Sequence, residues 1–155
     1  QPMKVNQMTK VAILFVSCYG HTAKQADAVA RGARSVSEAE VTVLRIDDNG
    51  ELPAGSLDVL VTQDAVIYGS PTYMGGPAWQ FKKFADATSK LWVKQALKNT
   101  LAAGFTNSGS VNGDKFSTIQ YQWTLSQQHG QLWVGLGLLP ANKTTCGPDD
   151  INRTG

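Results

Sequence analysis

A chain of 155 residues, 42% of them hydrophobic, is long enough for one compact domain and too short for two of ordinary size. The formal net charge of +2 comes from scattered basic residues, which argues against nucleic acid as a partner. No apolar stretch approaches the roughly 20 residues that a membrane-spanning helix needs, so we expect no membrane insertion. We therefore predict a single domain over residues 1–155.

The two cysteines, Cys18 and Cys146, have neither metal-ligand nor disulfide spacing. The first residues also lack the charged-then-apolar pattern of a secretory signal. Together these features favour a cytoplasmic location. Because no cluster of histidine, cysteine and carboxylate residues has ligand spacing, we expect no metal site.

The first predicted strand is Val11–Val16, an unbroken apolar run. A run of this kind is buried on both faces and is typical of a parallel sheet covered by helices. A helix is predicted to follow over 23–34. Its start is indicated by Thr22 and Gln25, which have the spacing of a capping box.

Strands and helices continue to alternate along the rest of the chain. Further strands are predicted at 41–46, 65–69, 100–106 and 131–136, and further helices near 57–61, 77–87 and 115–128. The alternation predicts an α/β fold, a three-layer sandwich around a five-stranded parallel sheet. No helical pattern follows the last strand. Either a closing helix is missing from this chain or a partner covers that surface.

Three of the predicted strands lead into loops of unusual composition, at 17–22, 70–77 and 107–114. Right-handed crossovers place all three at the sheet edge where open α/β sheets bind ligands. The first loop offers hydroxyls and a helix N-terminus to a phosphate. The second offers Pro71, Tyr73 and two glycines to a flat ring, and the third offers main-chain N–H groups to ring oxygens and nitrogens. This combination predicts bound flavin mononucleotide (FMN).

Four motifs then carry a resemblance to a known family. They are Ser17-Cys18-Tyr19-Gly20-His21, Ser70-Pro71-Thr72-Tyr73-Met74-Gly75, Leu91-Trp92 followed by Ala96-Leu97, and Gln128-His129-Gly130. From Thr9 to Leu139 the chain resembles the flavodoxin-like superfamily and, within it, the WrbA family of NAD(P)H:quinone oxidoreductases. The resemblance implies an FMN-dependent enzyme that transfers two electrons from NAD(P)H to a quinone and assembles as a homo-oligomer, a dimer or a tetramer.

The resemblance also implies roles for individual residues. The FMN-binding positions are Ser17, Cys18, Tyr19, Gly20, His21 and Thr22 for the phosphate, Pro71, Thr72, Tyr73, Met74 and Gly75 for the isoalloxazine, and Asn107, Ser108, Gly109, Ser110, Val111, Asn112 and Gly113 for its pyrimidine side. The substrate positions are Tyr19 for the nicotinamide, Trp92 over the flavin of a neighbouring subunit, and His129 beside the ring and the substrate. His129 is the expected catalytic residue, as a donor to the quinone oxygen.

Two other functions remain open at this point. One is a non-enzymatic, flavodoxin-like FMN protein that carries single electrons, although the basic balance of charge argues against an acidic shuttle. The other is a flavin-free interaction module. It is favoured by the third loop, where Ser110-Val111-Asn112-Gly113-Asp114-Lys115 replaces the family's run of glycines. The other three tryptophans, Trp79, Trp123 and Trp133, are predicted to pack in the interior.

Overall fold

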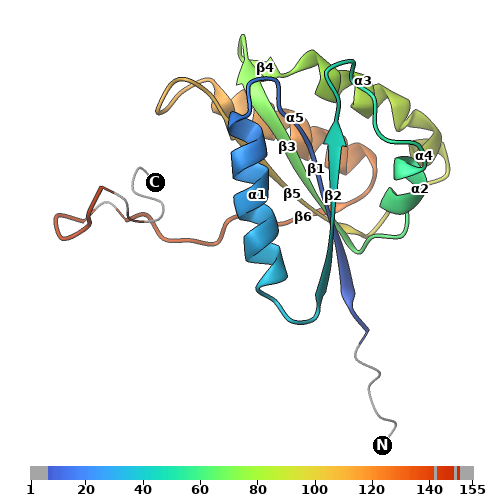
Figure 1. The fold of residues 1–155 in the computed structure, drawn as a ribbon, viewed down its shortest axis with the longest axis horizontal. Helices are drawn as coiled ribbons and strands as arrows, with labels where there is room; N and C mark the ends of the chain where they lie inside the picture. The colour runs from blue at the N-terminus through green and yellow to red at the C-terminus, as the bar shows by residue number, and fades with distance from the viewer. Residues whose placement is uncertain (1–6, 142, 149, 151–155) are drawn as a thin grey trace, which may run out of the picture.

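A parallel sheet forms the middle layer of the structure, a computed structural model that describes residues 7–141, 143–148 and 150 (Figure 1). Its strands are β1 (Thr9–Val16), β2 (Ala39–Ile46), β3 (Ala65–Tyr73), β5 (Leu101–Asn107) and β6 (Leu132–Trp133). They lie in the order β2-β1-β3-β5-β6, and all pair in parallel. A two-residue strand, β4 (Gly76–Pro77), pairs antiparallel with the end of β3. The predicted α/β fold with five parallel strands is confirmed, and β4 is an addition to it.

Helices cover both faces of this sheet. They are α1 (His21–Arg34), α2 (Ser56–Leu60), α3 (Trp79–Ala87), α4 (Ser89–Val93) and α5 (Lys115–Gln128). Two consecutive residues of β1 show the layering, because successive side chains of a strand point to opposite faces. Ile13 packs in one core with Ala26 and Ala30 of α1. Leu14 packs in another with Phe81 of α3 and Leu125 of α5.

The second core is centred on Phe81, which is fully buried. Its ring lies 6.1 Å from that of Tyr68, 5.7 Å from that of Phe84 and 6.2 Å from that of Tyr121, in edge-on arrangements that aromatic pairs favour. The Tyr68 hydroxyl donates a hydrogen bond to Gln131 Oε1 at 2.8 Å, and burial raises the pKa of this phenol. Phe81 thus joins α3, β3 and α5.

Several element boundaries differ from those predicted. The helix expected from residue 77 begins at Trp79, because Pro77 belongs to β4. The capping box is not formed: α1 has no side-chain cap, and Thr22 Oγ1 instead accepts a hydrogen bond from Asn107. The short helix α4 was not predicted. The strand expected over 131–136 is reduced to β6.

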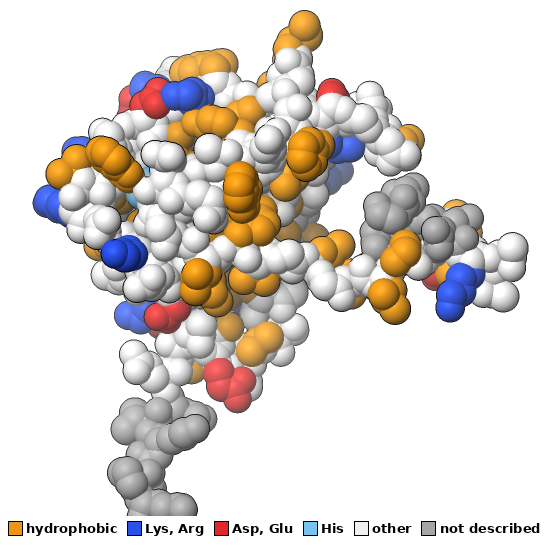
Figure 2. All heavy atoms as spheres, turned by 180° about the vertical axis from the view of Figure 1, so that it is seen from behind, with side chains coloured by type: hydrophobic (Ala, Val, Ile, Leu, Met, Phe, Trp, Pro, Cys, Tyr) orange, Lys and Arg blue, Asp and Glu red, His pale blue; other side chains and the backbone are white. Residues whose placement is uncertain are grey.

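Two tryptophans expected in the interior are at the surface instead. Trp79 is 60% exposed and Trp123 is 46% exposed, whereas Trp133 packs partly buried against the core. Trp123, Trp133, Phe116 and Ile119 line a hollow of about 260 Å³ on the α5 side of the molecule. Figure 2 shows this side, from behind Figure 1, with hydrophobic side chains gathered over its middle.

The α1 face of the sheet also carries a hollow, of about 340 Å³, over β1, β3 and β5. Ile67, Ala103 and Val134 are among the apolar residues that line it. Among the described helices, only α1 contributes side chains to the core on this face. Within the described part of the chain, none of the helices has the length and apolar character to cross a membrane.

Candidate functional site

The loop between β1 and α1 presents main-chain N–H groups that have no partner in the described part of the chain. These are the N–H groups of residues 19–22, the last two of which belong to the first turn of α1. Ser17, whose side chain is buried, braces the turn by accepting a hydrogen bond from Ala23 N at 3.1 Å. Gly20 has a φ of 88°, a conformation that glycine adopts without strain. The loop is therefore shaped as an anion site at a helix N-terminus.

The third loop is tied to the first by side-chain hydrogen bonds. Asn107 Nδ2 donates to Thr22 Oγ1 at 3.0 Å and to Gln25 Oε1 at 2.9 Å. Gln25 Nε2 in turn donates to the Thr106 carbonyl at 3.1 Å. Two of the predicted binding residues, Thr22 and Asn107, thus use their side chains to hold the loops together. Sequence reasoning gave Gln25 a capping role and missed this bracing one.

The second loop is a β-hairpin, not the open loop that was expected. Met74 has a φ of 48° and Gly75 one of 78°, as in the two-residue type I′ turn that matches the twist of paired strands. Tyr73, Met74 and Gly75 are exposed at its tip, and Met74 fully so. Pro71 and Thr72 are buried beneath them. The hairpin thus has an exposed tip, at residues 73–75, and a buried base, at Pro71 and Thr72.

A cluster of threonine hydroxyls holds that base. Thr72 Oγ1 lies 2.7 Å from Thr106 Oγ1 and donates to Thr118 Oγ1, also at 2.7 Å. These residues belong to β3, β5 and α5, so the cluster fixes the hairpin against the start of the third loop. The glycine-rich and serine-rich composition of the loops gave no signal for Thr118.

Tyr19 of the first loop and Tyr73 of the second lie close together beyond the carboxyl ends of the strands. The rings of Tyr19 and Tyr73 have centroids 6.2 Å apart and planes 71° apart, and Tyr19 is 81% exposed. The pKa of the Tyr73 phenol is raised to about 12. Desolvation is the largest cause, and a hydrogen bond and charge repulsion from Cys18 add to it. This phenol is therefore neutral at physiological pH. With Met74, the pair offers a neutral, largely apolar surface suited to a flat ring.

The remaining predicted positions of the third loop are exposed or half-buried. Ser108 is half-buried, and Gly109, Ser110, Val111, Asn112 and Gly113 are exposed. The loop ends at Asp114, which precedes α5 with a φ of 45°. Cys18 and His21 complete the first loop, Cys18 half-buried as a free thiol and His21 exposed.

Trp92 and His129 lie together, but at the opposite edge of the sheet from the three loops of the same chain. His129 follows the end of α5, where Gly130 O accepts a hydrogen bond from Asn99 N just before β5 begins. The loops, in contrast, follow the ends of β1, β3 and β5. Trp92, which is half exposed, and His129 line one hollow of about 470 Å³. Any contact of these two side chains with a flavin would therefore require a second copy of the chain.

The protonation of His129 follows from its single hydrogen bond. Its Nε2 lies 2.9 Å from Thr88 Oγ1, and the Thr88 hydroxyl donates its own proton to the Ala85 carbonyl at 2.6 Å. His129 Nε2 must therefore carry a hydrogen and donate it. The buried Nδ1 has no partner among the described residues, and burial lowers the pKa of the ring. His129 is a neutral imidazole at neutral pH.

This depressed pKa predicts how stability depends on pH. An unfolded histidine takes up a proton as the pH falls through about 6.5, whereas folded His129 resists it, so stability is complete above that pH and decreases below it. We expect the free energy of unfolding to decrease between pH 7.5 and 5.5 in the wild type, and to decrease less in His129→Gln. Denaturant titrations at the two pH values measure the difference. Equal decreases in both proteins would contradict the assignment.

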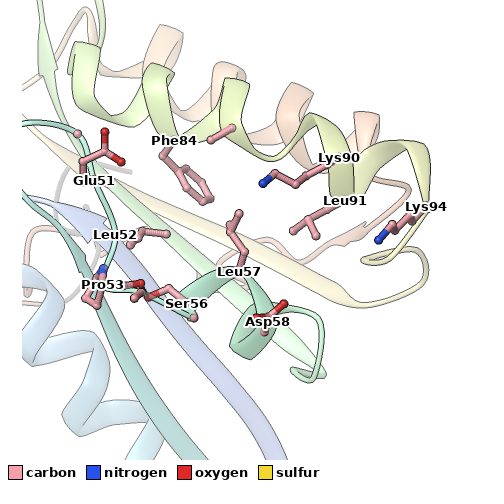
Figure 3. A pocket seen from close by; sticks show the side chains of 14 residues that line it. Glu51, Leu52, Pro53, Ser56, Leu57, Asp58, Phe84, Lys90, Leu91 and Lys94 are labelled. Atoms are coloured by element: carbon pink, nitrogen blue, oxygen red, sulfur yellow. Dashed lines mark hydrogen bonds between the residues drawn. The ribbon is translucent and has the colours of Figure 1, made fainter.

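A separate hollow of about 400 Å³ lies between the β2–α2 loop and the α3–α4 segment. Figure 3 shows Leu57 and Leu91 pointing toward one another across it, with Phe84 at one end and Lys90 and Lys94 along the α4 side. None of the predicted site residues lines it. It is distinct from the three loops.

In the stretches that the structure describes, no three or more histidine, cysteine and acidic residues gather as they would around a metal ion.

Comparisons with known proteins agree with this geometry. Residues 13–126 match the family model described as flavodoxin. The chain is 43% identical over 148 residues to flavodoxin FldP of Pseudomonas aeruginosa, covering 96% of this chain and 77% of that protein. It is 47% identical to a solved flavodoxin, WrbA-like protein from Agrobacterium tumefaciens, with a TM-score of 0.78, 86% of this chain covered and 81% of the other. A flavodoxin from the domain Archaea, 21% identical with a TM-score of 0.64 and coverages of 81% and 78%, shares the fold.

Proposed function

Because the chain belongs to the flavodoxin family, we propose that it binds FMN at the three loops and acts as an electron carrier. The observation that carries this proposal is the anion site at residues 19–22 beside the Tyr19–Tyr73 surface. FMN has the two parts that such a site requires, a phosphate and a flat ring. When bound, FMN supplies the redox chemistry, accepting and releasing one or two electrons.

Each part of the site has a distinct task. The free N–H groups of residues 19–22 would hold the phosphate. Tyr19, Tyr73 and Met74 would contact the ring, and residues 107–113 would line its pyrimidine side. The hydrogen bonds from Asn107 to Thr22 and Gln25 keep the first and third loops at a fixed separation. The protein's contribution is therefore to position the ring and to tune its charge.

A carrier is favoured over an NAD(P)H:quinone oxidoreductase by the position of His129. This residue lies with Trp92 at the sheet edge opposite the loops, so a single chain lacks it beside its own ring. The relative named flavodoxin FldP also supports a carrier. The reductase remains the second candidate because the WrbA-like structure is 47% identical and because the half-exposed Trp92 is available to a neighbouring copy. In that case NAD(P)H and a quinone are the substrates, and the protein is a dimer or tetramer.

FMN binding is the first test of the proposal. Flavin fluorescence should be quenched as FMN is added to the purified chain, with one FMN bound per chain. Riboflavin, which lacks the phosphate, should bind far more weakly because nothing then meets the N–H groups of residues 19–22. A protein that leaves FMN fluorescence unchanged would contradict the proposal and favour a flavin-free interaction module.

A second experiment separates the carrier from the reductase. In an anaerobic reductive titration, a carrier should take up electrons in two resolved one-electron stages, and NADH or NADPH should reduce its flavin only slowly. Rapid bleaching by either nucleotide, followed by reoxidation with a quinone, would instead establish the reductase. The His129→Gln variant sharpens this outcome, since it should lower quinone turnover more than FMN affinity if His129 is catalytic.

A further inference from the structure

The side chain of Lys115 turns back from the first residue of α5 over the third loop. Its Nζ donates hydrogen bonds to Ser108 Oγ at 2.7 Å and to the Ser110 carbonyl at 2.6 Å. The nearest carboxylate oxygen, Oδ1 of Asp114, is 3.9 Å away on a side chain that is 42% exposed. The Lys115 side chain is only 23% exposed. The ammonium is thus held mainly by neutral oxygens. Ser108 Oγ, which accepts from Lys115, also donates to Asp114 Oδ1 at 3.3 Å, so the carboxylate compensates the positive charge in part.

This charge belongs to the loop cluster of the candidate site. The third loop begins where β5 ends, and β5 pairs with β3 up to Pro71 and Asn107. The Thr72–Thr106 contact then fixes the hairpin beside the start of the same loop. A second cation lies near a different part of the site, because Arg45 Nη2 donates to the Ser17 carbonyl at 3.2 Å beside the first loop. Lys115 therefore lies beside the third loop and Arg45 beside the first.

We propose that Lys115 stabilises the negative charge that the flavin ring gains on reduction, and so raises the midpoint potential of bound FMN. The proposal rests on the proposed binding of FMN. An oxidised ring is neutral; on taking up two electrons from a reductant and one proton at N5, it becomes a monoanion. A partly buried ammonium whose charge is compensated only in part favours the anion and contributes little to binding of the neutral ring.

A purely structural role for Lys115 makes a different prediction. If the ammonium only closed the third loop through Ser108 and Ser110, its loss would weaken binding of oxidised and reduced FMN equally. The midpoint potential depends on the ratio of the two affinities, so it would then stay unchanged. The potential therefore separates charge stabilisation from loop closure.

The test compares Lys115→Gln and Lys115→Met with Lys115→Arg, which keeps the charge. For each FMN-loaded protein, the dissociation constant of oxidised FMN is measured by fluorescence and the midpoint potential by anaerobic equilibration with a reference dye. In both neutral variants we expect the preference for reduced over oxidised FMN to fall about tenfold, which is about 30 mV for a two-electron couple. Lys115→Arg should keep most of the wild-type potential.

Arg45→Gln is the matched control, because it removes one positive charge beside the first loop. It is expected to change FMN affinity equally in both redox states, since the phosphate charge does not change on reduction. An unchanged potential in Lys115→Gln and Lys115→Met, with wild-type FMN binding intact, would overturn the inference alone. A wild-type chain that fails to bind FMN would overturn the proposed function and the inference with it.

Discussion

Replacing Gly20 by valine is expected to weaken FMN binding by at least about tenfold, which is about 1.4 kcal/mol. Gly20 has a φ of 88°, and a side chain in this region costs roughly 1–2 kcal/mol, with β-branched residues the least tolerated. An added Cβ would meet no atom within 4 Å, so the effect arises from backbone conformation and not from a clash. The loop relieves this strain by moving the N–H groups of residues 19–22 away from the phosphate.

Gly32→Ala in α1 is the control for this experiment. Gly32 has no positive φ, and a Cβ there also meets open space. Alanine should stabilise the helix by about 0.5–1 kcal/mol and leave FMN affinity unchanged. Fluorescence titration and thermal unfolding of both variants give the two readings. Wild-type affinity in Gly20→Val would mean that the first loop does not bind the phosphate in this conformation.

Replacing Phe81 by alanine is expected to lower the free energy of unfolding by about 3–5 kcal/mol. The Phe81 ring is fully buried and contacts the rings of Tyr68, Phe84 and Tyr121. Its removal leaves a cavity where α3, β3 and α5 meet, and neighbouring rings cannot fill it without leaving their own positions. Urea unfolding followed by circular dichroism measures the loss.

Phe116→Ala deletes the same side chain from the surface of α5, where it is 74% exposed. A change within about 0.5 kcal/mol is expected there, since little apolar area is lost from the interior. A loss below about 1 kcal/mol in Phe81→Ala would show that the second core does not depend on this ring.

The fold could be predicted wherever one local pattern dominated. The unbroken run Val11–Val16 identified a strand buried on both faces, and the helix predicted over 115–128 has the bounds of α5. The β3–β4 hairpin was missed because Pro71 and Pro77 indicate an irregular loop, whereas the turn itself lies at Met74-Gly75. The capping box failed for a different reason. Thr22 and Gln25 have the correct spacing, but Asn107, far away in sequence, competes for both side chains.

The candidate site followed from topology more than from single residues. Parallel strands joined by crossovers end at one edge, so the three loops could be placed together without knowing any contact. The sequence could not show which loop residues hold the loops in place and which are exposed to a ligand. Thr72 and Asn107 hold the loops by hydrogen bonds, whereas Tyr19 and Tyr73 are exposed. The resemblance that implies a place for His129 beside a flavin does not specify which chain's flavin it would meet.

The separation of Trp92 and His129 from the loops has a consequence for kinetics. A carrier is complete as one chain, so electron uptake per molecule should not depend on protein concentration. A reductase that needs these side chains against another copy's flavin obeys mass action between chains. Its specific activity would fall on dilution below the dissociation constant of the assembly. The reaction rate should thus follow the first power of the protein concentration for a carrier, and a higher power below that dissociation constant for a reductase.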